Sequence, residues 1–275
     1  MRVWVGTSLV DEAEARVSVF DRGLTVGDGV FETLKIVDGR AFAVTRHLRR
    51  LEDSAAGLGL PAPDVQVVRE AISAVIAANA EDLGNFARLR ITYTAGPSAL
   101  GSDRGGGVPT LLVAASASTA WPATTAVVTV PWRRNEHSSV VGLKTTSYAE
   151  NVIALAHAKS HQASEAIFAN TAGLLCEGTG SNVFVVRGGV AATPLLSSGA
   201  LPGITRELVL EWTAAIEARL SMDDLAAADE VFLTSSTRDV HPVHRVGDVE
   251  LGAPGPVTAS IARIFAQRSG TEVDP

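Results

Sequence analysis

The chain has 275 residues, of which 46% are hydrophobic and 19% are charged, with a formal net charge of −7 and a mean hydropathy of +0.21. This length suffices for one large or two modest domains with a sizeable core, and the composition excludes a disordered protein. The acidic balance, without a basic stripe interleaved with aromatic residues, excludes a nucleic-acid-binding surface.

The residues that report on cellular compartment are few. The single cysteine, Cys176, cannot form an intramolecular disulfide, which fits a reducing cytosol, and we expect it to be a small buried residue. The first residues lack the pattern of a signal peptide, and no apolar stretch is long enough for a membrane span. We therefore expect a cytoplasmic protein without a membrane partner.

The first part of the chain alternates short strands with amphipathic helices. Residues 30–37 show the period-two alternation of a strand, and Asp38-Gly39 is typical of a hairpin turn. A helix is expected from Thr45, as its cap, to Leu58, because apolar residues recur on one face. The other elements expected here are a helix at 63–80 and strands at 2–5, 16–20, 41–44, 87–94 and 110–115.

A second set of elements follows a stretch of small and polar residues at 116–124. The strands expected there are at 126–130, 166–169, 174–177, 182–186, 190–193, 230–234 and 240–246, and the helices are at 148–162, 204–219, 222–227 and 257–267. The chain is thus predicted to be α+β with two domains, each with an antiparallel or mixed sheet. We expect a small N-terminal domain at 1–115, a linker at 116–124 and a larger C-terminal domain at 125–275.

Arg50 is the first candidate for binding an anion. It lies on the helix expected at 45–58, where the arginines Arg46, Arg49 and Arg50 could simply pair with Glu52 and Asp53. The alternative is that Arg50 clamps a phosphate, which suits the planar guanidinium group.

Arg88 and Arg90 are two residues apart on an expected strand, so both point to the same face. Two arginines would be costly on a core face. This face is therefore either exposed to solvent or lines an anion site, for which a substrate carboxylate is a natural guest.

Lys144 is a more specific chemical signal. It follows V-V-G-L at an expected strand end and precedes three hydroxyl residues and Tyr148. A lysine at a strand end can point to water, but a desolvated lysine has a lowered pKa and becomes a nucleophile towards aldehydes. Tyr148, four residues on, can supply a hydroxyl group beside the resulting imine.

Glu177 stands among small residues in E-G-T-G-S-N, so that the backbone can approach a flat ligand. A hairpin turn with a solvated glutamate is the alternative, and the flanking apolar residues make it less favoured. Such a carboxylate can hold a protonated ring nitrogen, which suits a Schiff-base cofactor carried by a lysine.

The segment L-P-G-I-T-R at 201–206 opens an expected helix. Free N–H groups at a helix N-terminus, with the Thr205 hydroxyl, form a phosphate cradle, although an ordinary helix start would look the same. The hydroxyl cluster at 234–237 could share that phosphate. No metal site is expected, because His241 and His244 lack further cysteine or histidine ligands at the right spacing.

Together these blocks resemble the class IV aminotransferases, the pyridoxal-phosphate enzymes of fold type IV. The resemblance covers nearly the whole chain through ordered blocks: D-R-G-L-T-V-G-D-G-V-F-E-T, H-L-R-R-L-E-D-S-A, L-K-T-T-S-Y-A-E-N, C-E-G-T-G-S-N-V-F, L-P-G-I-T-R and V-F-L-T-S-S-T. It implies the fold type IV architecture, pyridoxal 5'-phosphate as cofactor, small amino and keto acids as substrates, and a homodimer with shared active sites.

The resemblance also implies a role for each candidate. Lys144 carries the cofactor and moves the Cα proton, and Glu177 pairs with the ring nitrogen. The other cofactor-binding residues it implies are Arg50, Tyr148, Leu201, Gly203, Ile204, Thr205, Ser236 and Thr237. The substrate-binding candidates are Phe31, Arg88 and Arg90.

Within the family, the first block and K-T-T-S-Y resemble the D-amino acid aminotransferase and lyase branches most. We therefore expect a transaminase that moves an amino group between a D-amino acid and a 2-keto acid. The alternatives are a 4-amino-4-deoxychorismate lyase, which releases pyruvate and 4-aminobenzoate, and a branched-chain L-aminotransferase. The chain departs from the D-specific pattern at Thr94-Ala95-Gly96, where T-R-G is usual, so Arg88 and Arg90 are the candidates for a carboxylate.

Overall fold

The computed structural model describes residues 1–275 and divides into two compact units. Unit 1 consists of Met1–Ala120, Leu143–Ser147 and Val273–Pro275, and unit 2 consists of Trp121–Gly142 and Tyr148–Glu272. The chain thus returns to unit 1 for the short segment that contains Lys144, and again for its last residues.

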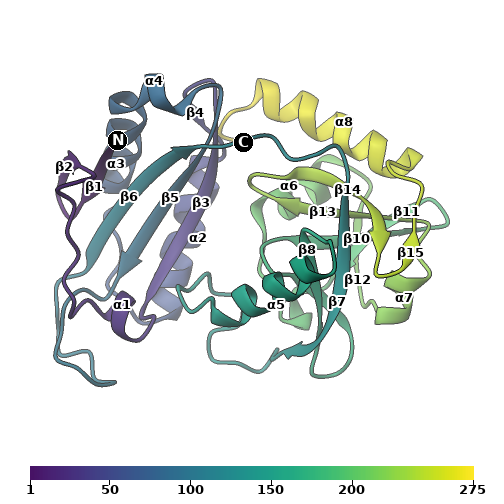
Figure 1. Cartoon of the computed structure of the whole chain (residues 1–275), viewed down its shortest axis with the longest axis horizontal. Coiled ribbons are helices and arrows are strands. Elements are labelled where there is room, and N and C mark those ends of the chain that lie inside the picture. The colour runs from purple at the N-terminus through teal and green to yellow at the C-terminus, as the bar shows by residue number, and fades with distance from the viewer. The chain divides into compact units, whose positions relative to one another are not determined.

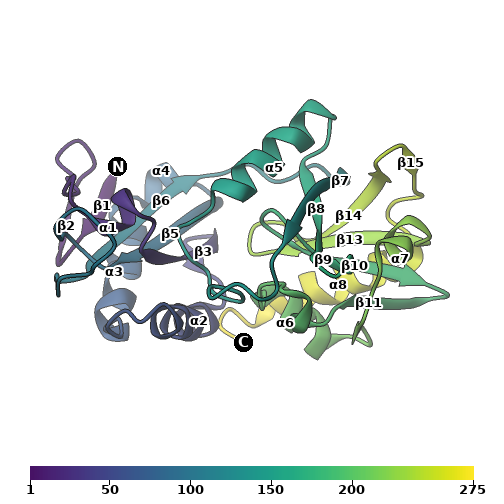
Figure 2. The ribbon, with the colours of Figure 1, turned by 90° about the horizontal axis from the view of Figure 1, so that it is seen from below.

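Unit 1 contains a six-stranded antiparallel sheet in the order β2-β1-β6-β5-β3-β4, with α2 and α3 packed on one face (Figures 1 and 2). Its strands are β1 (Arg2–Val5), β2 (Ser8–Asp11), β3 (Gly29–Val37), β4 (Arg40–Ala41), β5 (Phe86–Thr94) and β6 (Thr110–Ala117). Its helices are α1 (Arg22–Thr25), α2 (Val44–Gly57), α3 (Val65–Ala78) and α4 (Ala80–Leu83).

The alternation of residues in β3 and β5 decides which side chains enter the core of unit 1. Val30, Leu34 and Ile36 are fully buried against α2 and α3, together with Leu89 and Ile91 of β5. The opposite face carries the residues between them. There the register of β3 with β5 pairs Phe31 with Thr92, Thr33 with Arg90 and Lys35 with Arg88.

Helix α2 does not begin as the sequence predicts. Its N-cap is Ala43, which has a left-handed backbone with φ of 55° and no side chain that could cap. Thr45 lies inside the first turn instead, and Asp274 from the far end of the chain accepts hydrogen bonds from the Thr45 N–H at 2.7 Å and the Thr45 hydroxyl at 2.6 Å. The carboxylate of Asp274 thus satisfies an N–H group that the helix leaves open.

Unit 2 contains a nine-stranded mixed sheet in the order β12-β11-β10-β13-β14-β7-β8-β9, with β15 paired to β14. Its strands are β7 (Thr125–Arg134), β8 (Glu165–Asn170), β9 (Leu175–Gly178), β10 (Asn182–Arg187), β11 (Val190–Pro194), β12 (Ile216–Ala218), β13 (Glu230–Ser235), β14 (Asp239–Val246) and β15 (Val249–Glu250). Its helices are α5 (Ala149–Ser160), α6 (Ile204–Trp212), α7 (Met222–Ala226) and α8 (Pro256–Thr271), with a 3₁₀ turn, η1 (Leu196–Ser198).

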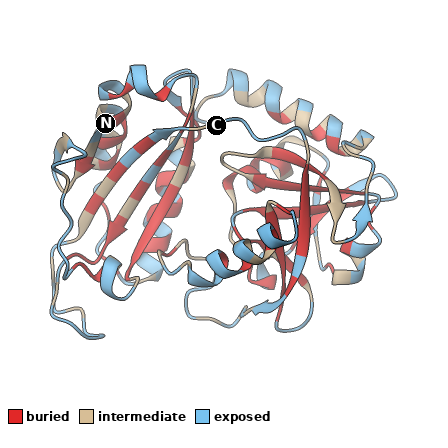
Figure 3. Cartoon of the chain, viewed as in Figure 1, coloured by how far each residue is buried: buried red, intermediate tan, exposed pale blue.

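The helices of unit 2 cover different parts of this sheet. Helix α5 packs on β7 and β8, whereas α8 packs on β13 and β14 and α6 packs on β13 and α8 (Figure 2). Buried residues concentrate on the central strands (Figure 3), where the rings of Phe184 and Phe232 stack with centroids 4.6 Å apart. The mixed α/β architecture predicted from the sequence is confirmed.

Three of the predicted elements are wrong. Residues 16–20 form no strand. The helix expected to run to residue 219 ends at Trp212, and β12 follows it and pairs in parallel with β11. Residues 139–142 form turns, and Leu143 and Lys144 belong to no strand, so the strand end expected before Lys144 is absent. None of the helices combines the length and apolar character that crossing a bilayer requires.

Replacing Asp274 with alanine is expected to lower the free energy of unfolding of unit 1 by about 1 kcal/mol, because the first turn of α2 loses its carboxylate partner. Urea unfolding followed by circular dichroism measures the change. Asp53→Ala is the matched control, since Asp53 is exposed on the same helix. Equal effects of the two substitutions would contradict the capping role of Asp274.

Candidate functional site

Lys144 is held at the edge of the sheet of unit 1. Its carbonyl oxygen accepts a hydrogen bond from the Phe31 N–H at 2.9 Å, and the Thr146 N–H donates to Gly29 at 2.8 Å. Thr145 forms an antiparallel bridge with Val30. The Lys144 segment therefore pairs with the start of β3 at the edge of the sheet, which fixes the lysine backbone although no regular strand includes the residue.

The side chain of Lys144 lies on the face of β3 opposite the helices. Its Nζ lies 4.3 Å from the centroid of the Phe31 ring, and the guanidinium carbon of Arg90 lies 3.3 Å from the same centroid. Phe31 is buried, and Lys144 is half-buried. The structure thus brings together three of the residues singled out in the sequence: an amine, a guanidinium group and an aromatic ring between strands β3 and β5.

The other face of β3 carries Glu32, whose side chain is fully buried. Arg50 donates two hydrogen bonds to this carboxylate, from Nε at 2.8 Å and from Nη2 at 2.7 Å, and His47 Nδ1 lies 2.6 Å from the same group. The suggestion that Arg50 pairs with Glu52 or Asp53 is therefore wrong. A buried partner holds Arg50, and both guanidinium contacts come from the forked geometry that favours carboxylates.

Burial, neighbouring charges and hydrogen bonds act in opposite directions on the pKa values of Glu32 and His47. Burial alone would raise the pKa of Glu32, but the charge of Arg50 and the hydrogen bonds from Arg50 and His47 outweigh it and lower the pKa to about 2. Burial lowers the pKa of His47, and the charges of Arg50 and Lys144 add to this effect, against the hydrogen bond with Glu32. We therefore assign an ionised Glu32 and a neutral His47 that donates its Nδ1–H.

Helix α2 links this trio to Lys144. His47, Arg50 and Ser54 are three and four residues apart and share one face of the helix. All three are buried, and the Ser54 hydroxyl accepts a hydrogen bond of 3.1 Å from the Lys144 N–H. The same helical face therefore orients Arg50 and anchors the lysine backbone.

In unit 2, Glu177 lies on β9 and is held through both carboxylate oxygens. Its Oε1 lies 3.2 Å from Arg134 Nε, and its Oε2 accepts a hydrogen bond of 2.9 Å from the Leu201 N–H. The side chain of Glu177 is only 13% exposed, so the alternative of a solvated hairpin glutamate is wrong. The Arg134 guanidinium group lies beside this carboxylate, which can accept a hydrogen bond from a protonated ring nitrogen.

The turn before α6 is built around Asn182. The Asn182 amide donates to the Leu201 carbonyl at 2.8 Å, and a Cβ atom at Gly203 would lie 1.9 Å from the Asn182 Oδ1. Only glycine fits there, which explains the L-P-G sequence. Glu177 and Asn182 thus clamp the two sides of Leu201.

The N-terminus of α6 fits a phosphate group. Its N-cap, Gly203, offers no side chain, so no internal cap occupies the first N–H groups of the helix. Thr205 is buried in the first turn. The buried Thr234 hydroxyl at the end of β13 has no hydrogen-bond partner, and Thr234 pairs in register with Asn182. Open N–H groups and a buried hydroxyl without a partner suit an anionic oxygen ligand.

The remaining predicted residues occupy less informative positions. Arg88 is exposed and lies two residues before Arg90 on the same face of β5, where it pairs with Lys35 of β3. Tyr148 is half-buried at the start of α5. Ser236 and Thr237 are half-buried directly after β13.

Four residues of the site were missed in the sequence. Glu32 and His47 support Arg50, and Arg134 and Asn182 support Glu177 and its turn. A signal for Glu32 existed, because the alternation of β3 places it on the core face between Val30 and Leu34. For the other three residues the partners are distant in the sequence, and no local pattern marks them.

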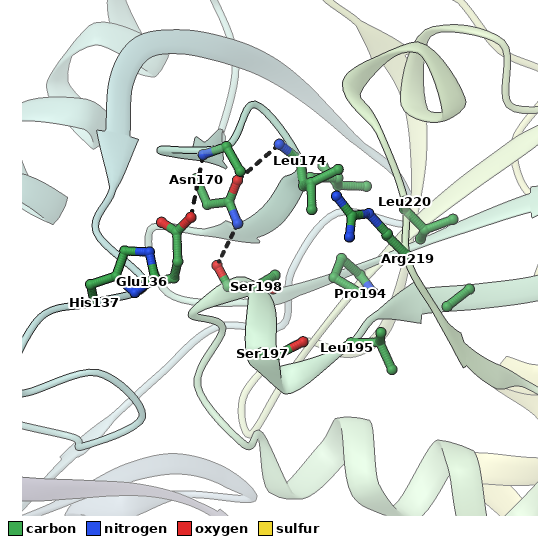
Figure 4. Close-up of a pocket in the computed structure, with 13 residues that line it drawn as sticks. Glu136, His137, Asn170, Leu174, Pro194, Leu195, Ser197, Ser198, Arg219 and Leu220 are labelled. Carbon is green, nitrogen blue, oxygen red and sulfur yellow. Dashed lines mark hydrogen bonds between the residues drawn. The ribbon is translucent and has the colours of Figure 1, made fainter.

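A separate pocket of about 280 Å³ lies in unit 2, and none of the predicted site residues lines it (Figure 4). Asn170 connects its walls by accepting from the Leu174 N–H at 2.9 Å and donating to the Ser198 carbonyl at 3.2 Å. Cys176 also donates to Ser198, and burial raises the pKa of this thiol to about 12. Cys176 is thus the inert buried residue that was expected.

The stability of unit 1 is expected to fall at acid pH because of Glu32. Its pKa is about 2 in the folded chain against an ordinary value of 4.5, so the stabilisation is complete above pH 4.5 and is lost as the pH falls to about 2. This carboxylate alone contributes about 3 kcal/mol to the free energy of unfolding over that range. Urea unfolding at a series of pH values measures it.

Glu32→Gln should be less stable at pH 7 and should show a flatter pH profile, because it removes the titrating group. Glu52→Gln, at an exposed position on α2, should keep the profile of the unchanged protein. Parallel profiles for the unchanged protein and Glu32→Gln would show that Glu32 does not titrate in this way.

Comparisons with known proteins identify the family and the fold. The family model of amino-transferase class IV matches residues 29–246. A Methanocaldococcus jannaschii protein, whose name assigns it provisionally to the branched-chain-amino-acid aminotransferases, is 33% identical over 90% of this chain and 88% of its own length. A D-alanine aminotransferase of Listeria monocytogenes is 29% identical over 97% of this chain and 96% of its own.

The structure of a fold IV transaminase from Curtobacterium pusillum superposes with a TM-score of 0.87 at 30% identity, covering 96% of this chain and 99% of that one. The sequence resemblance is thus confirmed along with the fold. The chain belongs to the class IV aminotransferases, a family of pyridoxal-phosphate enzymes.

Proposed function

We propose that the protein is a transaminase that moves an amino group between a D-amino acid and a 2-keto acid. The observation that carries this proposal is the contact of Lys144 and Arg90 with the same Phe31 ring. A reactive amine beside a permanent guanidinium charge suits a substrate that carries a carboxylate next to its amino group. The similarity to D-alanine aminotransferase along almost the whole of both chains supports the D-amino acid.

Pyridoxal phosphate, when bound, supplies a ring that withdraws electrons from the substrate Cα. We assign Lys144 Nζ to bind the cofactor and then to move the proton at Cα, as both base and acid. Glu177 would accept a hydrogen bond from the protonated ring nitrogen, and Arg134 orients the Glu177 carboxylate for this task. Arg90 binds and orients the substrate carboxylate, and Phe31 supports its guanidinium group.

Phosphate binding is assigned to the residues that present N–H groups, hydroxyl groups or a guanidinium group. These are Arg50, Gly203, Ile204, Thr205, Ser236 and Thr237, and Leu201 and Tyr148 are assigned to the ring. The buried Thr234 hydroxyl and the uncapped start of α6 support the phosphate assignment. We also expect the enzyme to be a cytoplasmic homodimer.

A branched-chain L-aminotransferase is the second candidate, because the Methanocaldococcus jannaschii relative carries that name at 33% identity. It uses the same lysine and glutamate and differs only in the handedness and side chain of its substrate. An aminodeoxychorismate lyase also needs Lys144, but it needs no keto acid acceptor.

Titration of the purified enzyme with single amino acids tests the function. D-alanine or D-glutamate alone should abolish the visible absorbance of the lysine-bound cofactor, and pyruvate or 2-oxoglutarate should restore it. L-leucine and L-valine should act at least about tenfold less efficiently, a difference of about 1.4 kcal/mol in transition-state binding. A preference for the L-amino acids would select the branched-chain candidate, and no response to any amino acid would favour the lyase.

The control for this titration is Lys144→Ala, which should lose the absorbance band, whereas Lys159→Ala, at an exposed position on α5, should keep it. A band that persists in Lys144→Ala would overturn the assignment of this lysine.

Arg90→Gln is expected to lower kcat/KM for amino acids by about 10- to 100-fold, since a charge-assisted hydrogen bond to the carboxylate contributes about 1.5–3 kcal/mol. Arg88→Gln is the matched control, because both arginines are exposed on the same strand face but Arg88 pairs with Lys35, further along β3 from Phe31, and it should change kcat/KM by less than about threefold. Steady-state kinetics with D-alanine measures both. If Arg88→Gln is the more damaging change, Arg88 rather than Arg90 binds the carboxylate.

A further inference from the structure

A buried arginine holds the loop that follows β5. The Arg22 side chain, which is 4% exposed, donates hydrogen bonds to three successive carbonyl groups of this loop. The acceptors are Gly101 at 3.0 Å, Ser102 at 3.0 Å and Asp103 at 2.8 Å. One guanidinium group thus fixes the shape of the loop at 97–108, which contains no regular secondary structure.

Asp28 is the centre of this arrangement. Its Oδ2 accepts from Arg22 Nε at 2.9 Å and from Arg104 Nε at 2.8 Å, and its Oδ1 accepts from Arg104 Nη2 at 2.6 Å. Arg104 also donates to the carbonyl groups of Leu58 and Gly59 at the end of α2. The carboxylate therefore connects the loop, through both arginines, to the helix that carries Arg50.

The neighbours of Asp28 hold the Lys144 segment. The Thr146 hydroxyl donates to the Gly27 carbonyl at 2.9 Å, and the Thr146 N–H donates to the Gly29 carbonyl at 2.8 Å. Gly27 has φ of +68°, and a Cβ atom there would lie 2.5 Å from the Ser147 hydroxyl. The turn at 27–29 thus contacts the Lys144 segment through the Thr146 hydroxyl group and through one backbone hydrogen bond from the Thr146 N–H, at a glycine where a side chain would be too close to Ser147.

We propose that Asp28 is a positioning residue that couples the conformation of the loop at 97–108 to the Lys144 segment. The chain of contacts is continuous: loop carbonyl groups, Arg22 and Arg104, the Asp28 carboxylate, the turn at 27–29, and Thr146 two residues after the lysine. An ordered loop holds the turn, and the turn sets the position of the lysine backbone. Any effect of Asp28 on catalysis acts through Lys144, so the kinetic part of this proposal rests on the proposed function. The coupling between the loop and the Lys144 segment does not depend on that function.

Hydrogen exchange of the protein without cofactor tests the coupling directly. The reporters are the N–H groups of Ser98, which donates to Phe20, and of Thr146 and Phe31, which hold the Lys144 segment. Asp28→Asn places an amide donor against a guanidinium donor, so we expect exchange to accelerate at least about tenfold at all three reporters. Asp103→Asn is the matched control in the loop, because Asp103 is exposed and gives Arg22 only its carbonyl oxygen.

Faster exchange at Ser98 alone would show that Asp28 only fastens the loop and would overturn the proposal, as would unchanged exchange at all three sites. If Asp28→Asn does not fold, Arg104→Gln removes one of the two partners at a side chain that is 37% exposed, and it should accelerate the same three reporters to a smaller extent. These measurements need no substrate, so they stand even if the proposed transaminase activity fails.

In the enzyme loaded with pyridoxal phosphate, Asp28→Asn should lower kcat about tenfold and shift the pH midpoint of the cofactor absorbance, with KM changed by less than about threefold. A loop that only shapes the substrate pocket would instead change KM and leave the pH midpoint unmoved, and this result would also overturn the proposal. Asp103→Asn should leave all three quantities as in the unchanged enzyme.

Discussion

Unit 1 depends on a carboxylate that has no contact with solvent. An isolated ionised carboxylate in a core costs several kcal/mol, and Glu32 is stable there only because Arg50 and His47 together satisfy it. Glu32 belongs to a strand and its two partners to α2, so the trio fixes the rotation of that helix about its own axis. Ser54, one turn further on, then meets the Lys144 N–H. One buried ion pair thus helps to determine the positions of Arg50 and of the Lys144 backbone, two groups to which the proposed function assigns roles.

In unit 2 the carboxylate of Glu177 is likewise held by protein groups on both of its oxygens. Glu177 is bound by Arg134 on one oxygen and by the Leu201 N–H on the other. The Leu201 carbonyl is bound in turn by Asn182, whose close approach requires glycine at position 203. In both units the charged group is oriented by the protein before any ligand arrives. Such preorganisation avoids the cost of reorienting dipoles during the reaction.

Sequence reasoning predicted the features that neighbouring residues determine, and it missed the contacts between residues far apart in the chain. The alternation of β3, the paired arginines of β5 and the L-P-G turn could be read because neighbours within a few residues decide them. The partner of Arg50 could not, since Glu32 lies 18 residues away on another element. Helix α6 stops at Trp212 because the chain then turns to pair with β11, and no local pattern announces that pairing. Lys144 lies at a sheet edge because its carbonyl accepts from the Phe31 N–H and the next two residues pair with Val30 and Gly29, and it belongs to no regular strand of its own.

The face of the unit 1 sheet opposite the helices gathers basic side chains, although the chain as a whole is acidic. The chain carries a net charge of −7, but this face gathers Lys35, Arg88 and Arg90 from two neighbouring strands, with Lys144 at its edge. The contacts of Arg90 and Lys144 with the Phe31 ring help to hold the two side chains in place, and a contact of this kind contributes about 0.5–2 kcal/mol. Local potential rather than net charge determines which ligands gather at a site. In the proposed function, a substrate carboxylate that approaches Phe31 meets the Arg90 and Lys144 side chains already in position, and it loses little of its binding energy to ordering them.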